Sequence, residues 1–82
     1  MEIQLSKKAA KELDKIPEPI FSNLRRKIGV LSQNPTPTNS KRLANWAGYR
    51  LRVGDYRILY EVESEKKMVI IYRIAHRKDA YR

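Results

Sequence analysis

The sequence predicts an α+β fold in the order β-α-α-β-β-β, with an N-terminal helical hairpin packed on one face of a small, mainly antiparallel sheet. Apolar residues between residues 7 and 33 recur every three or four positions, which is the spacing of amphipathic helices. In residues 49–62 they alternate with polar residues, which is typical of strands with one buried face. The apolar run MVIIYRIA, at residues 68–75, supplies a further strand.

Residues 2–5 predict a short strand at the edge of the sheet, because they alternate polar and apolar side chains. Ser6 follows directly and is a suitable N-cap, since its hydroxyl can accept a hydrogen bond from an amide of the first helical turn. We expect this helix over residues 7–16. Pro17 ends it, because proline has no amide proton and crowds the preceding turn.

A second helix is expected to begin near Glu18 and Pro19, because proline fits the first turn of a helix. Asn34 and Pro35 end it, since the residue before a proline disfavours helical geometry. The apolar stripe of this helix consists of Ile20, Leu24, Ile28 and Leu31. The lysines and arginines of the two helices are expected on a solvated face.

The stretch NPTPTNSKRLANWAG, at residues 34–48, predicts a long loop because it is rich in proline, threonine and asparagine. Loops of this length are uncommon unless they have a function or are mobile. Lys41 and Arg42 lie in it and are candidate phosphate-binding residues. Trp46 is expected to anchor the core rather than to stack on a nucleic-acid base.

The hairpin predicted for residues 49–62 is closed by Gly54 and Asp55, a pair that favours a two-residue turn of type I′ or II′. Such a turn sets the register of the strands that it joins. The expected cross-strand pairs are Val53 with Tyr56, Arg52 with Arg57, Leu51 with Ile58, and Arg50 with Leu59. The apolar members of the hairpin then share the face that packs under the helices.

The opposite face carries Arg50, Arg52 and Arg57, and we call it the arginine face. Like charges directly opposite each other across two strands are destabilising. Departures from such local rules tend to mark functional sites. The simpler alternative is that these arginines only keep a small protein soluble.

The strand predicted over residues 68–75 is expected to be buried on both faces, after a turn around residues 64–67. Extending the hairpin register to it places Leu59 beside Tyr72 and Arg57 beside Ile74. Because side chains alternate along a strand, His76 is then expected to leave on the arginine face.

The composition points to an anionic partner. The chain has 82 residues with a net charge of +9, which suits a nucleic acid or an acidic protein. It contains no cysteine and one histidine, so no disulfide, thiolate nucleophile, metal site or cofactor is expected. No secretory or membrane-spanning segment is apparent, which predicts one cytoplasmic domain over residues 1–82.

RNA cleavage by the RNA's own 2′-hydroxyl is chemistry that suits these residues, because it needs neither a metal nor a covalent intermediate. It needs a group that accepts the 2′ proton, cations that stabilise charge developing at phosphorus, and a donor for the departing 5′ oxygen. Arginine suits the second role because its planar fork holds two phosphate oxygens. The tail AHRKDAYR adds His76, Arg77 and Tyr81.

The hairpin YRLRVGDYRILYEV followed by IYRIAHRKDAYR resembles the RelE/ParE toxin superfamily, and specifically its RelE-like branch. The resemblance covers essentially the whole chain and agrees with the predicted order of elements. It implies the toxin of a type II toxin–antitoxin system, a metal-independent endoribonuclease that cuts mRNA in the A site of the 70S ribosome. It also implies neutralisation by an acidic RelB-like antitoxin that wraps around the toxin, in a complex that often binds operator DNA.

The resemblance also implies roles for single residues. Arg50 and Arg52 match the family's first pair of basic strand residues, where some RelE-like enzymes have lysines. Arg57 matches the arginine of the next strand, and the tail supplies the remaining two matches, Arg77 and Tyr81. Because arginine does not give up its proton, proton acceptance would fall to Tyr81 or to His76.

Two other readings are compatible with the sequence. A ParE-like toxin of the same superfamily would inhibit DNA gyrase and need no nuclease site; the tail residues argue against it. A non-catalytic module would use the basic face only to hold nucleic acid or an antitoxin. Growth arrest with breaks inside translated codons distinguishes the nuclease from both.

Overall fold

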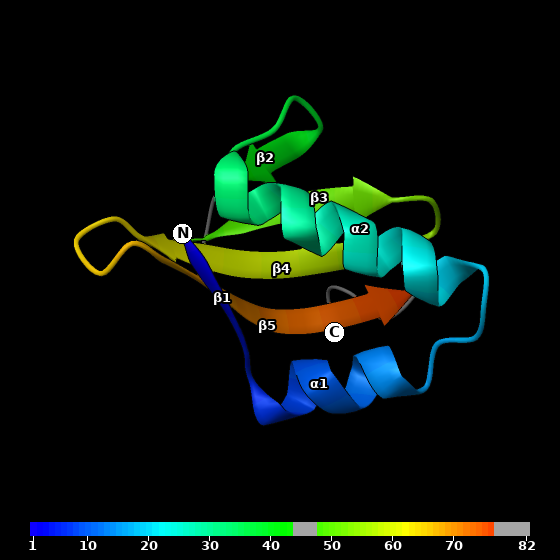
Figure 1. Cartoon of the computed structure of the whole chain (residues 1–82). Helices are drawn as coiled ribbons and strands as arrows, with labels where there is room; N and C mark the ends of the chain where they lie inside the picture. Colours follow the sequence, from blue (N-terminus) through cyan, green and yellow to red (C-terminus); the bar gives the residue numbers. More distant parts are fainter. Residues whose placement is uncertain (44–47, 77–82) are drawn as a thin grey trace.

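The computed structural model describes residues 1–43 and 48–76, which form one five-stranded sheet and two helices (Figure 1). The strands are β1 (Glu2–Leu5), β2 (Ser40–Arg42), β3 (Tyr49–Val53), β4 (Tyr56–Glu63) and β5 (Met68–His76). They lie in the order β1-β5-β4-β3-β2. β1 runs parallel to β5 and the other neighbours are antiparallel, which confirms the predicted α+β class and the predicted edge strand.

The first helix, α1 (Lys7–Asp14), begins as expected at Ser6, whose Oγ accepts a hydrogen bond of 3.0 Å from the amide of Ala9. It ends before the predicted boundary, and a tight turn then carries the chain to Ile16, which is buried. α1 contacts mainly β5. Neither helix in the described part of the chain is long and apolar enough to cross a membrane.

The second helix, α2 (Ile20–Gln33), packs against β1, β3 and β5 through Leu24, Ile28 and Leu31, all of which are buried. The prediction that Ile20 belongs to this buried stripe is wrong, because its side chain is 38% exposed. Ile20 begins the helix beside the turn between β3 and β4, where it lines an open hollow instead of the core.

The strand β2 was not expected, since its residues fall in the predicted loop. It pairs with β3, so that Ser40 lies opposite Leu51 and Lys41 lies opposite Arg50. β2 has only three residues and all are polar, so no periodicity reveals it in the sequence. The prediction for Trp46 concerns residues 44–47, which lie outside the described residues.

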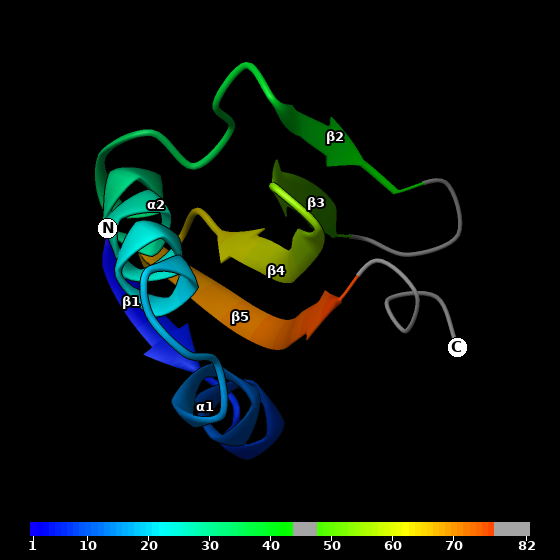
Figure 2. The ribbon, with the colours of Figure 1, turned by 90° about the vertical axis from the view of Figure 1, so that its right-hand side faces the viewer.

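The register of the predicted hairpin is confirmed: Val53 lies opposite Tyr56 and Arg52 lies opposite Arg57. Gly54 has a φ of +58°, whereas Asp55 is not among the residues with positive φ, a combination typical of a type II′ turn. The apolar face of β3 and β4 lies under α2, and no described helix covers the arginine face (Figure 2).

The predicted register of β5 is wrong from Tyr72 onward. Tyr60 lies opposite Ile71 while Leu59 lies opposite Arg73, so Tyr72 is an extra residue that forms a β-bulge. Strict alternation from Ile71 would turn the charged Arg73 toward the core, whereas the bulge places Ile74 there.

The prediction that β5 is buried on both faces is also wrong. Val69, Ile71 and Ile74 are buried on the helix side, but Met68 and Ile70 are partly exposed. The reason is that the opposite face of the sheet has no described layer packed upon it (Figure 2).

Candidate nucleic-acid interface

The arginine face combines cations from three neighbouring strands. Arg52 of β3 lies directly opposite Arg57 of β4, and Lys41 of β2 lies opposite Arg50 of β3. Neither Arg52 nor Arg57 forms an ion pair with a carboxylate of the described residues. Among those residues, an ion pair joins Arg73 of β5 to Glu12 of α1. The charges of Arg52 and Arg57 are therefore not paired with a carboxylate in the described part of the chain.

Arg57 is the most constrained cation of this face, with only 7% of its surface exposed. Its Nη1 donates hydrogen bonds to the carbonyl oxygens of Gly54, at 3.3 Å, and Tyr56, at 3.1 Å. Its Nε is buried and has no hydrogen-bond partner among the described residues. Burial of an unsatisfied charged donor is costly, so the Nε of Arg57 is a donor that an acceptor outside the described residues would stabilise.

A hollow of about 180 Å³ lies beside these cations and is lined by Asn39, Lys41, Arg50 and Arg52. Asn39 Nδ2 donates a hydrogen bond of 3.1 Å to the carbonyl oxygen of Arg52, which ties the start of β2 to β3. The hollow presents donors and no carboxylate, a set that fits a phosphate group. Asn39 escaped the sequence analysis because a single asparagine in a loop gives no signal there.

Tyr60 holds the segment that leads to this hollow. Its hydroxyl donates a hydrogen bond of 2.7 Å to the carbonyl oxygen of Pro35, and its ring stacks on Tyr49 with centroids 5.6 Å apart. Its side chain is fully buried, and burial raises the pKa of its phenol; the neighbouring Ser40 hydroxyl lowers this pKa by less, and Tyr49 adds a smaller rise. The neutral phenol thus anchors the chain between α2 and β2.

Two predicted site residues lie away from the arginine face. Arg42 pairs with Tyr49, which places it on the other face of the sheet. His76 pairs with Tyr56, and the two rings meet edge to face with centroids 5.5 Å apart. The prediction that His76 leaves β5 on the arginine face is therefore wrong, and the cause is the bulge at Tyr72.

His76 and Tyr56 line a second hollow of about 370 Å³, together with Ile20, Asn23 and the turn between β3 and β4. The predicted site residues Arg77 and Tyr81 lie outside the described residues. Among the residues that are described, no three carboxylates, histidines or cysteines are grouped so that they could hold a metal ion.

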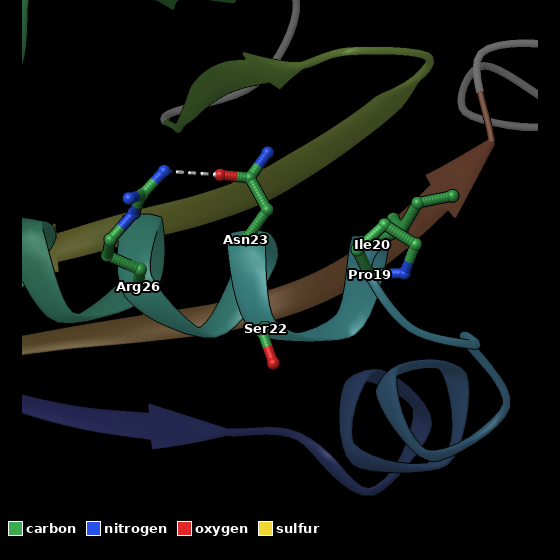
Figure 3. A pocket seen from close by; sticks show the side chains of 5 residues that line it. All are labelled: Pro19, Ile20, Ser22, Asn23 and Arg26. Atoms are coloured by element: carbon green, nitrogen blue, oxygen red, sulfur yellow. Dashed lines mark hydrogen bonds between the residues drawn. The ribbon is translucent and has the colours of Figure 1, made fainter.

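A third hollow, of about 490 Å³, lies at the start of α2 and is lined by Pro19, Ile20, Ser22, Asn23 and Arg26. Figure 3 shows Arg26 beside Asn23, whose Oδ1 accepts a hydrogen bond of 2.9 Å from Arg26 Nη2. Arg26 is the one cation that lines this hollow, and no residue of the arginine face contributes to it. We therefore place the candidate interface on the arginine face.

Comparison with known proteins gives matches over nearly the whole chain. A family model described as the ParE toxin of type II toxin–antitoxin systems, parDE, matches residues 3–81. Toxin RelG of Mycobacterium tuberculosis is 32% identical over 82 residues, which cover 98% of this chain and 94% of the relative.

Solved structures show the same fold. The archaeal RelE in its complex with RelB from Pyrococcus horikoshii superposes with a TM-score of 0.84 at 25% identity, covering 96% of this chain and 97% of that one. A chain of the RelBE2 toxin–antitoxin complex from Mycobacterium tuberculosis superposes with a TM-score of 0.81 at 28% identity, with coverages of 92% and 95%. The similarity includes the sheet that carries the arginine face.

Proposed function

Because the chain belongs to the RelE/ParE superfamily of toxins from type II toxin–antitoxin systems, we propose that it is a RelE-like endoribonuclease that cuts mRNA in the ribosomal A site. The observation that carries this proposal is Arg57, a buried guanidinium opposite Arg52 on a face that no described helix covers. A phosphate oxygen is an acceptor that suits this donor, because hydrogen bonds between guanidinium and phosphate are charge-assisted.

The reaction that these residues support transfers the phosphate within the RNA. The 2′-hydroxyl attacks the adjacent phosphorus, its proton passes to a base, and the bond to the 5′ oxygen breaks as that oxygen takes up a proton. The products are a 2′,3′-cyclic phosphate and a 5′-hydroxyl. Arg57 stabilises the charge on the phosphorane, and Arg50, Arg52 and Lys41 hold the flanking phosphates.

The proton-transfer groups belong to the C-terminal segment. In the RelE-like pattern Tyr81 exchanges the proton, while Arg77 adds a further cation. His76 is the other candidate, but its ring lies against Tyr56, on the face opposite Arg57. This position favours Tyr81 as the proton carrier.

The partners follow from the same assignment. The related structures are complexes of RelE with RelB, so we propose a RelB-like antitoxin as the inhibitor of this chain. An acidic antitoxin suits a chain with a net charge of +9. The toxin–antitoxin complex would also bind operator DNA through the antitoxin, while the free toxin binds the ribosome and its mRNA.

Induced expression without an antitoxin tests the proposed function. Growth and translation should stop, and primer extension should place the breaks inside translated codons. The family description names ParE, so gyrase inhibition is the second candidate. Continued translation with stalled DNA replication would establish that candidate, whereas growth without any defect would leave a binding module.

Two substitutions test the assignment of the tail. Arg77→Ala and Tyr81→Phe should each abolish toxicity while the protein still folds and still binds its antitoxin. Arg25→Ala, at an exposed position on α2, is the matched control and should remain fully toxic. Full toxicity of both tail variants would overturn the catalytic assignment.

A further inference from the structure

The β-bulge in β5 divides the strand into two registers. Up to Ile71 the pairing follows the turn between β4 and β5, but from Arg73 onward every residue is displaced by one position. Without the bulge, Arg57 would lie opposite Ile74, and Tyr56 would lie opposite Ala75. In the structure Arg57 lies opposite Ala75, and Tyr56 lies opposite His76.

The helix α1 and its cap satisfy the backbone groups that the bulge exposes. Glu12 Oε1 accepts a hydrogen bond of 2.9 Å from the amide of Ile74, and Ser6 Oγ donates one of 3.0 Å to the carbonyl oxygen of Tyr72. The Tyr72 carbonyl loses its place in the ladder with β4 because of the bulge, and the Ile74 amide lies beyond the end of β1, whose pairing with β5 stops at Leu5 opposite Ile71. The bulge is therefore stabilised from outside the sheet.

Glu12 also holds the side chain that the bulge re-aims. Its Oε2 lies 3.0 Å from both Nε and Nη2 of Arg73, in a two-point contact between carboxylate and guanidinium. Both side chains are only about one-fifth exposed, at 21% and 22%, so water screens this pair less than a surface pair. The carboxylate of Glu12 thus binds both the amide of Ile74 and the guanidinium of Arg73, the two residues that follow the bulge at Tyr72.

The displaced register determines where the strand ends relative to Arg57. Arg77 follows the residue opposite Arg57 by two positions, instead of the three that an unbulged strand would give. One residue of extended chain spans about 3.3 Å, which exceeds the misplacement of about 1 Å that can slow a catalytic step by about 100-fold. The bulge also turns the ring of His76 onto Tyr56 and away from the arginine face.

We propose that Glu12 is a positioning residue, which sets the register of the end of β5 and thereby the place, relative to Arg57, at which the described strand ends. The effect on RNA cleavage rests on the proposed function. The effect on register does not, because it concerns only the pairing of β4 with β5.

The test compares Glu12→Ala with Glu12→Gln in the full chain, released from its antitoxin. The chain contains one histidine, so the ring protons of His76 can be identified by NMR without ambiguity. In Glu12→Ala the nuclear Overhauser contact between the rings of His76 and Tyr56 should disappear. The rate of ribosome-bound mRNA cleavage should fall by about 100-fold with an unchanged affinity for the ribosome.

Glu12→Gln is the conservative variant, because its amide oxygen still accepts the bond from Ile74. It should retain the ring contact and most of the cleavage rate. Glu65→Ala, at an exposed position in the turn between β4 and β5, is the matched control and should change neither quantity. If Glu12→Ala fails to fold, the NMR signal of the Ile74 amide proton in Glu12→Gln is measured instead. Its chemical shift should move upfield, because its hydrogen-bond acceptor loses the negative charge.

An unchanged ring contact in Glu12→Ala would overturn the proposal, as would an unmoved Ile74 amide in Glu12→Gln. A lost ring contact with normal cleavage would overturn the link to catalysis. A wild-type protein that does not cleave mRNA would contradict the proposed function alone, because the ring contact reports the register in the absence of any activity.

Discussion

Arg57 owes its position to the turn beside it. The positive φ of Gly54 directs the chain back so that two carbonyl oxygens meet one guanidinium nitrogen. A cation held in this way loses little freedom when it binds a phosphate, so its attraction is available in the transition state. The two-residue turn is thus both the connection of the hairpin and the support of the proposed catalytic cation.

Arg57→Lys tests whether geometry or charge matters at this position. Lysine keeps the charge but cannot bind the two turn carbonyls and a phosphate with a planar fork. We expect cleavage of ribosome-bound mRNA to slow by about 10²- to 10³-fold, in the range found for lost transition-state donors. Single-turnover cleavage is the measurement, and Arg25→Lys is the control. A wild-type rate in Arg57→Lys would show that charge alone suffices.

Tyr60 is expected to make stability depend on pH at the alkaline end. Burial raises the pKa of its phenol above the unfolded value of about 10, so the folded state favours the neutral form. The contribution of Tyr60 should be complete below about pH 10 and should be lost as the pH rises through the raised pKa.

Tyr60→Phe isolates this contribution. At neutral pH the variant should lose about 1 kcal/mol of unfolding free energy, because the hydrogen bond to Pro35 is absent. Above pH 10 the difference between the two proteins should shrink, since only the wild type has a buried phenol to ionise. Urea denaturation at several pH values measures both quantities. If the difference in unfolding free energy between wild type and Tyr60→Phe grows with pH, the raised pKa of Tyr60 is contradicted.

At the scale of elements, α2 stabilises the sheet through a narrow stripe. Leu24 is completely buried, whereas Val30 on the same helix is 45% exposed. Leu24→Ala should lower the unfolding free energy by about 2 to 5 kcal/mol through lost burial and a cavity. Val30→Ala is the matched control and should cost well under half as much. Equal losses in denaturant titrations would show that the helix packs differently.

The sheet separates what local sequence can predict from what it cannot. The register of β3 and β4 follows from Gly54 and Asp55, because a two-residue turn determines which residues face each other. Beyond Ile71 the register of β5 does not follow from its own turn, since the end of the strand is bound by a carboxylate of α1 that lies 62 residues from Ile74 in the chain. β2 was missed for a related reason: its three polar residues form a strand only because β3 provides the partner.

At the scale of the whole molecule, charge and fold act together. The net charge of +9 would attract a polyanion whatever the structure, but the sheet gathers Lys41, Arg50, Arg52 and Arg57 on one face, which neither described helix covers. The same sheet leaves Arg42 on the other face. Binding should therefore depend on a few cations rather than on the total charge.

The salt dependence of ribosome binding tests this distinction. The logarithm of the affinity should fall linearly with the logarithm of the salt concentration, because each phosphate contact releases counterions. Lys41→Gln and Arg52→Gln should each reduce the steepness by about one unit. Lys7→Gln, at an exposed position on α1, should leave it unchanged. A flat response in the wild type would mean that the basic face does not bind phosphates.

The sequence by itself determined the class of fold, the helix that Ser6 begins, the register of the hairpin and the pairing of Arg52 with Arg57. These features depend on residues that are near each other in the chain, so periodicity and turn chemistry are sufficient to find them. Only the tertiary structure decided that β2 exists and that His76 leaves on the helix side. Each of these results from contacts between distant segments, and their energies outweigh the simple alternation of a strand.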